Sequence, residues 1–289
     1  MEGICYLNGE YVNSGEATIS ASDRGFLYGD GLFETLRIYE GEVFLGDQHL
    51  ARLFRGASLL QIPIEKNPLF YHQVFRNIIE KNLLNEGFLR LSLSRGVGKR
   101  GLLPRQCNDP VVMVVPFFSI PYGEESYSKG FTAVTIKNTR RNPFSPLSKL
   151  KTFNYLDNIL AKMEAEERNA EEGLLLNVFG NLAGGTVSNL FVVKNRTLFT
   201  PTLNCGILNG ITRQRVIQLA LDKNIEVKET PLNSNQLYEA QEAFLTNSLM
   251  EIMPLVQVDG KSIGNGQPGP IARLLRNEYH KDIKKPRSL

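Results

Sequence analysis

The sequence is poor in the residues on which most metal-dependent and hydrolytic sites rely. Among its 289 residues it has only three histidines and three cysteines. No two histidines have the spacing of metal ligands, and neither H-E-x-x-H nor G-x-S-x-G occurs. The cysteines are odd in number and scattered, unlike a disulfide framework or a thiolate metal site. These absences argue against a zinc hydrolase, a serine hydrolase and a resident metal, and they favour a reducing cytoplasm.

Long apolar runs and basic stripes are also missing. No segment approaches the roughly 18–20 apolar residues that span a bilayer, and the start, MEGICYLNGEYVN, has no sustained apolar stretch of the secretory type. The net charge is +3, and much of the excess lies in the final KDIKKPRSL, which is more typical of a solvated end than of a nucleic-acid arm. We therefore expect neither membrane insertion nor nucleic-acid binding.

The composition that is present fits a folded protein of about two domains, with 42% apolar and 22% charged residues. Strand-like apolar runs cover residues 3–12, 32–45, 88–96, 109–118, 131–139, 171–180, 189–201 and 242–248. Apolar residues at helical spacing cover residues 48–62, 68–82, 154–170, 211–224 and 268–279.

A polar stretch with proline and glycine, SIPYGEESYSKG at residues 119–130, is the predicted linker. It separates an N-terminal domain, residues 1–118, from a C-terminal domain, residues 131–289. Strands and helices alternate irregularly in both halves. The sequence therefore predicts a two-domain α/β (α+β) fold with a cleft between the domains.

Two stretches have the features of anion sites, each with an ordinary alternative. In GILNGITRQRV, residues 206–216, an Asn-Gly turn precedes Thr212 at the start of a helix, whose free N–H groups suit a phosphate. The alternative is a plain capped helix. In QHLARLFR, His49 and Arg52 share one helix face, and Arg52 can bind a phosphate with two hydrogen bonds. The alternative is a surface arginine.

The segment SKLKTFNY, residues 148–155, holds two lysines just before an amphipathic helix. If the segment is extended, Lys149 and Lys151 point to the same side. A lysine that faces a cleft can lose its proton and form an imine with an aldehyde. Alternation alone does not choose between them, and either is otherwise a solvated surface lysine. In the helix that follows, the apolar residues share one face: Leu156, Ile159, Leu160 and Met163.

Six segments occur in an order that resembles one family. They are DRGFLYGDGLFETLRIYEG, DQHLARL, KTFNYLDNILAK, GGTVSNLF, GILNGITR and TNSLMEIMP. Together they resemble the class IV aminotransferases, the fold-type IV enzymes that use pyridoxal 5′-phosphate, over about residues 4 to 279. The resemblance implies a homodimer in which each active site borrows a loop from the partner subunit. It also implies a small-molecule amino substrate that carries a carboxylate.

The resemblance assigns roles to individual residues. Lys151 precedes the Asn-Tyr that opens the helix and is implied to be the imine-forming lysine, with Lys149 as support. Tyr155 is similar to the tyrosine that hydrogen-bonds the phenolic oxygen of the cofactor. The positions implied to bind the phosphate are those of Arg52, Ile211, Thr212 and Ser248.

One position departs from the family pattern. The family motif has a glutamate four residues before the serine of Ser-Asn, whereas LAGGTVSN has Gly184 there. That carboxylate normally faces the ring nitrogen of the cofactor and keeps it protonated, which improves the ring as an electron sink. Either another donor or water replaces it, or the reaction needs less of a sink, or the protein is a non-catalytic homologue. Nothing in the sequence supports Glu171 or Glu172 as the replacement.

The choice of reaction leans toward 4-amino-4-deoxychorismate lyase, which makes 4-aminobenzoate and pyruvate for folate synthesis. SRGVGKRG resembles the lyase R-G-x-G-x-R-G loop, in which Arg100 is a natural carboxylate partner, and FLTNSLMEI resembles the lyase T-N-S pattern. Tyr28 is a second candidate for orienting a carboxylate, and Phe33 and Leu102 indicate an apolar wall. The alternative is a branched-chain or D-amino-acid aminotransferase, because the segment DGKSIGNGQPGP of this chain resembles the C-terminal segment of those enzymes.

Overall fold

The computed structural model describes residues 3–120 and 122–285 and divides into two compact units. The first unit comprises Met1–Ile120 and Leu150–Asn154, and the second comprises Pro121–Lys149 and Tyr155–Leu289. Each unit has a sheet and a hydrophobic core of its own. The predicted two-domain fold of mixed helices and strands is confirmed.

The first unit is built on an antiparallel sheet with the strand order β2-β1-β6-β5-β3-β4. Its strands are β1 (Ile4–Leu7), β2 (Glu10–Asn13), β3 (Gly31–Tyr39), β4 (Glu42–Val43), β5 (Gly87–Ser94) and β6 (Val111–Phe117). Strands β3 and β5 pair from Gly31 with Ser94 to Ile38 with Gly87. Because side chains alternate along a strand, β3 directs Glu34 to one face of the sheet and Phe33 to the other.

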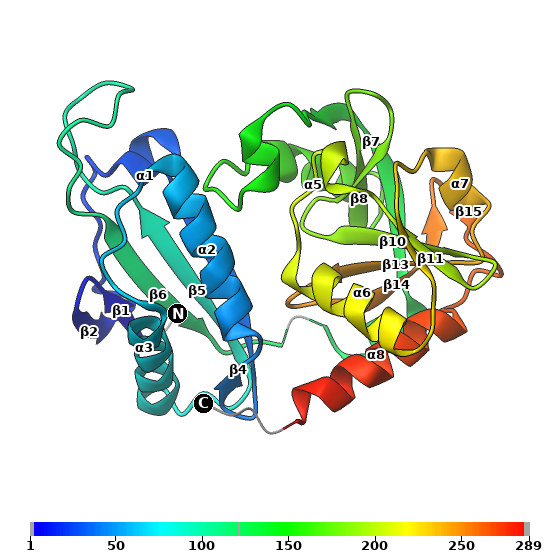
Figure 1. Ribbon diagram of the computed structural model, residues 1–289, viewed down its shortest axis with the longest axis horizontal. Helices are drawn as coiled ribbons and strands as arrows, with labels where there is room; N and C mark the ends of the chain where they lie inside the picture. Colours follow the sequence, from blue (N-terminus) through cyan, green and yellow to red (C-terminus); the bar gives the residue numbers. More distant parts are fainter. Residues whose placement is uncertain (1–2, 121, 286–289) are drawn as a thin grey trace. The chain divides into compact units, whose positions relative to one another are not determined.

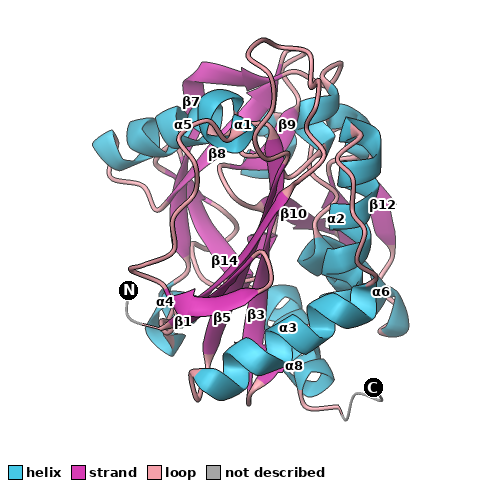
Figure 2. Ribbon diagram, turned by 90° about the vertical axis from the view of Figure 1, so that its left-hand side faces the viewer, coloured by secondary structure: helices cyan, strands magenta, loops and turns pink. Residues whose placement is uncertain are grey.

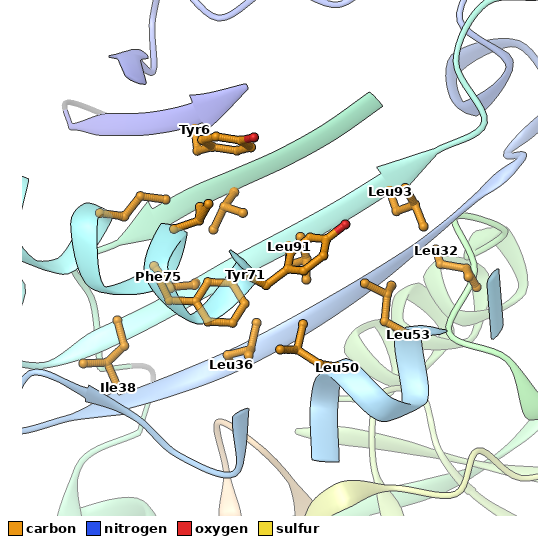
Figure 3. Packing of buried hydrophobic residues seen from close by; sticks show 14 of the residues in the cluster. Tyr6, Leu32, Leu36, Ile38, Leu50, Leu53, Tyr71, Phe75, Leu91 and Leu93 are labelled. Atoms are coloured by element: carbon orange, nitrogen blue, oxygen red, sulfur yellow. The ribbon is translucent and has the colours of Figure 1, made fainter. Parts of the chain in front are cut away.

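Helices α2 (Gly46–Leu60) and α3 (Pro68–Lys81) cover one face of this sheet (Figure 1). The packed side chains of Figure 3 include Leu50 and Leu53 of α2, Tyr71 and Phe75 of α3, Leu36 and Ile38 of β3, and Leu91 and Leu93 of β5. Burial of each such side chain contributes about 1.5–3 kcal/mol. This core fixes the orientation of α2 over β3, so residues of α2 that face the sheet are held rigidly.

The second unit has a mixed sheet with the order β12-β11-β10-β13-β14-β7-β8-β9, and β15 pairs with β14. Its strands are β7 (Phe131–Arg141), β8 (Glu172–Asn177), β9 (Leu182–Gly185), β10 (Asn189–Lys194), β11 (Thr197–Thr200), β12 (Val227–Glu229), β13 (Glu242–Asn247), β14 (Glu251–Val258) and β15 (Lys261–Ser262). Strand β7 is parallel to both β14 and β8, and β11 is parallel to β12. The long central strands are visible in Figure 2.

The helices of the second unit are α4 (Glu124–Lys129), α5 (Leu156–Glu167), α6 (Ile211–Asp222), α7 (Ser234–Tyr238) and α8 (Pro270–Ile283). Helices α6 and α8 pack together against the strands β13 and β14 (Figures 1 and 2). Within residues 3–120 and 122–285, no helix combines the length and the apolar character that crossing a membrane requires.

Helix α5 packs on its sheet with small residues rather than with its larger apolar side chains. Its small residues Ala161 and Ala165 pack on β7 and β8, with Val134, Ile136 and Leu175. The apolar stripe identified in the sequence is instead exposed, at 73% for Leu156, 50% for Ile159, 56% for Leu160 and 52% for Met163. An amphipathic pattern normally buries its apolar face within the chain, so this stripe is available to something outside it.

Two expectations for the middle of the chain were wrong. The C-terminal domain was predicted to carry Lys151, but Leu150–Asn154 belongs to the first unit because its backbone pairs with β3. The N–H of Phe33 donates to the Lys151 carbonyl (2.9 Å), and the N–H of Phe153 donates to the Gly31 carbonyl (3.0 Å). Residues 146–149 form a 3₁₀ turn rather than an extended strand, so Lys149 does not alternate with Lys151. The predicted linker contains α4.

Candidate active site

The side chain of Lys151 lies against an aromatic ring of the first unit. Its Nζ is 4.3 Å from the ring centroid of Phe33, and the guanidinium carbon of Arg90, on β5, is 3.8 Å from the same centroid. Phe33 is only 4% exposed, and its ring stacks at 6.4 Å on that of Phe153. A cation on an aromatic face gains about 0.5–2 kcal/mol. Phe33 therefore contacts both the lysine and a second cation.

A buried carboxylate fixes Arg52. Glu34, 1% exposed, accepts hydrogen bonds from Arg52 Nε (2.7 Å) and Nη2 (2.6 Å), in the two-point geometry that arginine and carboxylate favour. Glu34 Oε2 also lies 2.7 Å from Nδ1 of His49. His49 and Arg52 are three residues apart on one face of α2, as the sequence predicted, and both contact Glu34 of β3.

The protonation states of this network follow from its surroundings. Burial would raise the pKa of Glu34, but Arg52 and His49 outweigh it and lower this pKa to about 2. Burial, with Arg52 and Lys151 nearby, lowers the pKa of His49. Glu34 is thus ionised and His49 neutral at neutral pH, and Nδ1 of His49 donates to the carboxylate. With Lys151 and Arg90, the cluster keeps an excess of positive charge, which suits an anionic ligand.

The second unit supplies neutral donors instead of charges. Helix α6 begins at Ile211 and Thr212, both buried, after the N-cap Gly210, which has no side chain to cap its N–H groups. A nearby hydroxyl is also unsatisfied: Thr246 Oγ1, in a residue 1% exposed, has no hydrogen-bond partner among the described residues. Ser248 directly follows β13 and lies two residues after Thr246 in the chain. An uncapped helix N-terminus and an unsatisfied buried hydroxyl match the needs of a phosphate.

Gly210 and Asn189 explain the local approach of these segments. Asn189 of β10 pairs with Thr246 of β13 and donates from Nδ2 to the Leu208 carbonyl (3.0 Å). A β-carbon on residue 210 would lie 2.1 Å from Asn189 Oδ1. Glycine is therefore required where the turn before α6 meets the start of β10, and the sheet and the start of α6 are fixed together.

Tyr155 occupies the N-cap position of α5 in the second unit. Arg141, on β7, lies close enough to feel the charge of its phenol, and Arg141 Nη1 donates to Asn158 Oδ1 (3.3 Å). Asn158 in turn donates from Nδ2 to the Thr186 carbonyl. Burial lowers the pKa of Arg141. Tyr155 is thus placed beside the Arg141 cation.

Gly184 lies in a backbone conformation that disfavours any replacement. Its φ is +80°, and a β-carbon there would lie 2.6 Å from the Ser188 carbonyl oxygen. The adjacent turn is held by Glu172, which accepts from Thr186 N (3.1 Å), Thr186 Oγ1 (2.5 Å) and Ser188 Oγ (2.9 Å). Glu171 accepts from the N–H and the hydroxyl of Thr132. Both neighbouring carboxylates are therefore engaged by protein donors.

The two candidate carboxylate-binding residues lie in the first unit. Tyr28 ends the short helix α1 (Arg24–Tyr28) and is 39% exposed. Arg100 is exposed in the loop that follows β5, beside Leu102, which is 81% exposed. Leu102 therefore does not line a closed wall within the described chain, and of the predicted apolar pair only Phe33 is buried.

Comparison with known proteins places this geometry in a family. The protein-family model described as amino-transferase class IV matches residues 31–258. The chain is a member of the class IV aminotransferase family. A putative branched-chain-amino-acid aminotransferase of Methanocaldococcus jannaschii is 39% identical, with 96% of each chain covered. The aminodeoxychorismate lyase of Bacillus subtilis is 34% identical (97% and 95%), and the D-alanine aminotransferase of Bacillus licheniformis is 30% identical (96% of each).

Solved structures agree with the assignment. The branched-chain amino acid aminotransferase of Escherichia coli has a TM-score of 0.93 at 30% identity, covering 97% of this chain and 94% of that one. A second branched-chain amino acid aminotransferase, that of T.th., in a structure with pyridoxamine 5′-phosphate, has a TM-score of 0.93 at 31% identity (99% and 96%). This class IV family member is therefore an enzyme that uses pyridoxal 5′-phosphate. In the second unit, the uncapped start of α6 and the Thr246 hydroxyl suit the phosphate of that cofactor. In the first unit, Lys151 is an amine that can bond to its aldehyde.

Sequence reasoning did not identify three residues of the clusters described above. Glu34 was not identified, although a glutamate inside an apolar strand is a signal for a buried partner. Arg90 was missed because an arginine in an alternating strand resembles a solvent-facing residue. Thr246 was missed because a strand threonine carries no signal until its hydroxyl is found without a partner.

Proposed function

We propose that this class IV enzyme is a 4-amino-4-deoxychorismate lyase, which releases 4-aminobenzoate and pyruvate and serves folate synthesis. The observation that carries the proposal is Gly184. Its positive φ and the nearby Ser188 carbonyl oppose the glutamate that the family pattern has there. The lyase reaction ends in an aromatic ring, and aromatisation supplies driving force, so this reaction tolerates a weaker electron sink than transamination does.

The proposed roles follow from the contacts of each residue. The bound cofactor supplies an electron sink for the carbanion formed beside the substrate amine. Lys151, held over Phe33, would hold the cofactor and would accept the proton from the substrate carbon that carries the amine. In the second unit, the first-turn amides of α6 and the hydroxyls of Ser248 and Thr246 are the proposed phosphate donors. In the first unit, Arg52 is the phosphate partner that the family resemblance implies. Tyr155 donates to the phenolic oxygen, and Arg100, Arg90 and Tyr28 orient substrate carboxylates.

The second candidate is a transaminase for branched-chain or D-amino acids. It is favoured by the 39% identity to the putative branched-chain aminotransferase and by the buried ring of Phe33, which would suit an apolar substrate side chain. In that case the missing carboxylate at position 184 would slow turnover, because transamination depends more strongly on the electron sink.

We also propose that the enzyme is a homodimer of the cytoplasm. The exposed stripe of α5, from Leu156 to Met163, is the kind of apolar surface that protein interfaces cover. The three cysteines are buried free thiols, which fits a reducing compartment.

The deciding experiment supplies the cofactor-loaded protein with 4-amino-4-deoxychorismate and measures pyruvate and 4-aminobenzoate. We expect equal amounts of both products from the native protein and none from Lys151→Ala. Amino-group exchange between L- or D-amino acids and 2-oxoglutarate, without pyruvate from the lyase substrate, would contradict the lyase and support the second candidate. Gly184→Glu is a poor test of sink strength, because the backbone at this position disfavours any side chain.

A further inference from the structure

A buried arginine ties the loop after β5 to the helix α1. Arg24, 4% exposed, is the first residue of α1, and its Nη1 and Nη2 donate to the carbonyls of Gly101 (2.7 Å) and Leu102 (2.8 Å). Its Nε donates to Asp30 Oδ2 (2.8 Å). The two carbonyls directly follow Arg100 in the chain, so the fork of Arg24 holds the backbone at the base of this exposed side chain.

The sequence DRGFLYGDG explains why Arg24 can reach the loop. Asp23 caps α1 by accepting from Gly25 N (2.6 Å), and it also accepts from Ser94 Oγ (2.6 Å) at the end of β5. Gly29, with φ +67°, ends the helix after little more than one turn. Asp30 therefore returns to within reach of Arg24. The cap fixes the helix to β5, and the short turn brings the arginine and its carboxylate together.

Asp30 joins this contact to a second element. The same Oδ2 accepts from Arg95 Nε (2.7 Å), and Arg95, 6% exposed, donates to the carbonyls of Leu60 (2.7 Å) and Gln61 (2.8 Å) at the end of α2. Arg95 and Arg24 outweigh the burial that would raise the pKa of Asp30, and they lower it. One ionised carboxylate thus orients two guanidinium groups, one toward α2 and one toward the loop.

We propose that Arg24 is a positioning residue that sets the place of Arg100 and Tyr28 for the substrate carboxylate. The guanidinium carbon of Arg24 also lies 4.8 Å from the ring centroid of Tyr28. One buried group therefore contacts both the tyrosine and the backbone beside Arg100. This inference rests on the proposed function, in which those two residues orient a carboxylate, and it extends that function to a residue without substrate contact.

The geometry separates arginine from lysine at position 24. Only a guanidinium presents donors in a fixed planar fork, so it alone can satisfy Asp30 and two adjacent carbonyls at once. A lysine keeps the positive charge beside Asp30 but can reach fewer of these acceptors. Arg24→Lys therefore releases the loop while preserving the charge, and Arg55→Lys, at an exposed position of α2, is the matched control.

The first test is limited trypsin digestion, with cleavage sites located by mass spectrometry. The loop contains three exposed trypsin sites, at Lys99, Arg100 and Arg105. The rate of cleavage there therefore reports how often the loop backbone detaches from Arg24. We expect Arg24→Lys to be cut there at least about tenfold faster than the native protein, the factor for losing one charge-assisted hydrogen bond. Cleavage after Lys66, in another exposed loop of the same unit, should stay unchanged and serves as the internal control.

The second test is steady-state kinetics with whichever substrate the native enzyme converts. Arg24→Lys should raise KM about tenfold and leave kcat within about threefold, because the reacting groups are untouched. Native resistance to trypsin and native KM in this variant would overturn the proposal. If Arg24→Lys does not fold, Asp30→Asn is judged by the same criteria. A native protein without turnover refutes the proposed function instead, while the digestion still decides whether Arg24 holds the loop.

Discussion

The two units hold their candidate site residues by different means. In the first unit, buried carboxylates fix long cationic side chains: Glu34 holds Arg52, and Asp30 holds Arg24 and Arg95. In the second unit, backbone N–H groups at the start of α6 and hydroxyls such as Thr246 Oγ1 provide neutral donors, and position 184 has no acid. The first unit should therefore respond strongly to pH and to charge removal, and the second should respond to the loss of single hydrogen bonds.

The largest expected effect comes from removing Lys151, the proposed catalytic lysine of the first unit. Lys151→Ala should lower turnover by about 10³-fold or more, because the proposed base and covalent link are removed together. Lys149→Ala, at an exposed position of the 3₁₀ turn, should keep at least about a third of the native rate, within the range of a solvated surface change. The measurement is product formation by both variants. Equal losses in the two lysine variants would contradict the separation that the structure makes between them.

The next effect concerns the exposed stripe of α5 in the second unit. Leu160→Glu should weaken a homodimer at least about 30-fold, the effect of a charge in the centre of an apolar interface. Leu69→Glu, at a position of α3 that is 74% exposed, should leave assembly unchanged. Light scattering across a dilution series gives the result. A dimer of native affinity in Leu160→Glu would assign the stripe another partner.

Removing the charge of Glu34 tests whether a buried carboxylate holds the cationic side chains of the first unit. Glu34→Gln should destabilise the first unit by about 3 kcal/mol, because the half-buried Arg52 is left with a weaker partner. It should weaken pyridoxal 5′-phosphate binding by about ten- to a hundredfold. Chemical unfolding and titration of the cofactor absorbance measure the two effects. Glu42→Gln, exposed on the neighbouring strand β4, is the control, and equal behaviour of both variants would contradict the role of Glu34.

The same carboxylate predicts acid lability with a definite sign. The pKa of Glu34 is about 2 in the folded protein against 4.5 as an ordinary glutamate. Its stabilisation, roughly 3 kcal/mol, is present above pH 4.5 and is lost as the pH falls toward 2. The lowered pKa of His49 acts in the same direction below about pH 6.5, since the unfolded state then binds the proton more readily. Unfolding free energies of native protein and Glu34→Gln should converge on acidification; a constant difference would contradict this assignment.

The smallest effect tests the neutral donors of the second unit. Thr246→Val should leave the stability of the cofactor-free protein unchanged or slightly higher, because it removes a hydroxyl that has no partner in the described chain, yet weaken cofactor binding about tenfold. Thr200→Val is the matched control, since the Thr200 hydroxyl donates to the Leu190 carbonyl (2.9 Å). It should lose about 1 kcal/mol of stability with native cofactor affinity. Native cofactor affinity in Thr246→Val, with weakened affinity in Thr200→Val, would show that Thr246 does not belong to the proposed site.

Local patterns predicted most elements of the fold but not their partners. The amphipathic pattern of α2 and α3 was correct because their apolar faces pack on their own sheet. The same reasoning misjudged α5, since Ala161 and Ala165 allow close packing while the larger apolar residues point outward. The predicted strand at 189–201 is a hairpin, because Asn195 and Arg196 adopt positive φ between β10 and β11. Periodicity does not encode what a face packs against.

For the site, the sequence predicted residue types better than their supports. Arg52, Thr212 and Lys151 were identified from ordered segments, whereas Glu34 and Asp30, which orient the charged ones, depend on pairing across elements far apart in the chain. Alternation did not separate Lys151 from Lys149, because residues two apart in an extended segment share a face, and the 3₁₀ turn at 146–149 shows that Lys149 is not in such a segment. Only the pairing of residues 151–153 with β3 distinguishes them physically.

The most direct test of the account locates the modified lysine. The protein is loaded with pyridoxal 5′-phosphate, reduced with borohydride, digested with trypsin and analysed by mass spectrometry. The account predicts a pyridoxyl group on Lys151 in an intact peptide of residues 150–162, since trypsin does not cut after a modified lysine. Modification of Lys149 in a peptide of residues 142–151, or of neither lysine, would contradict the account.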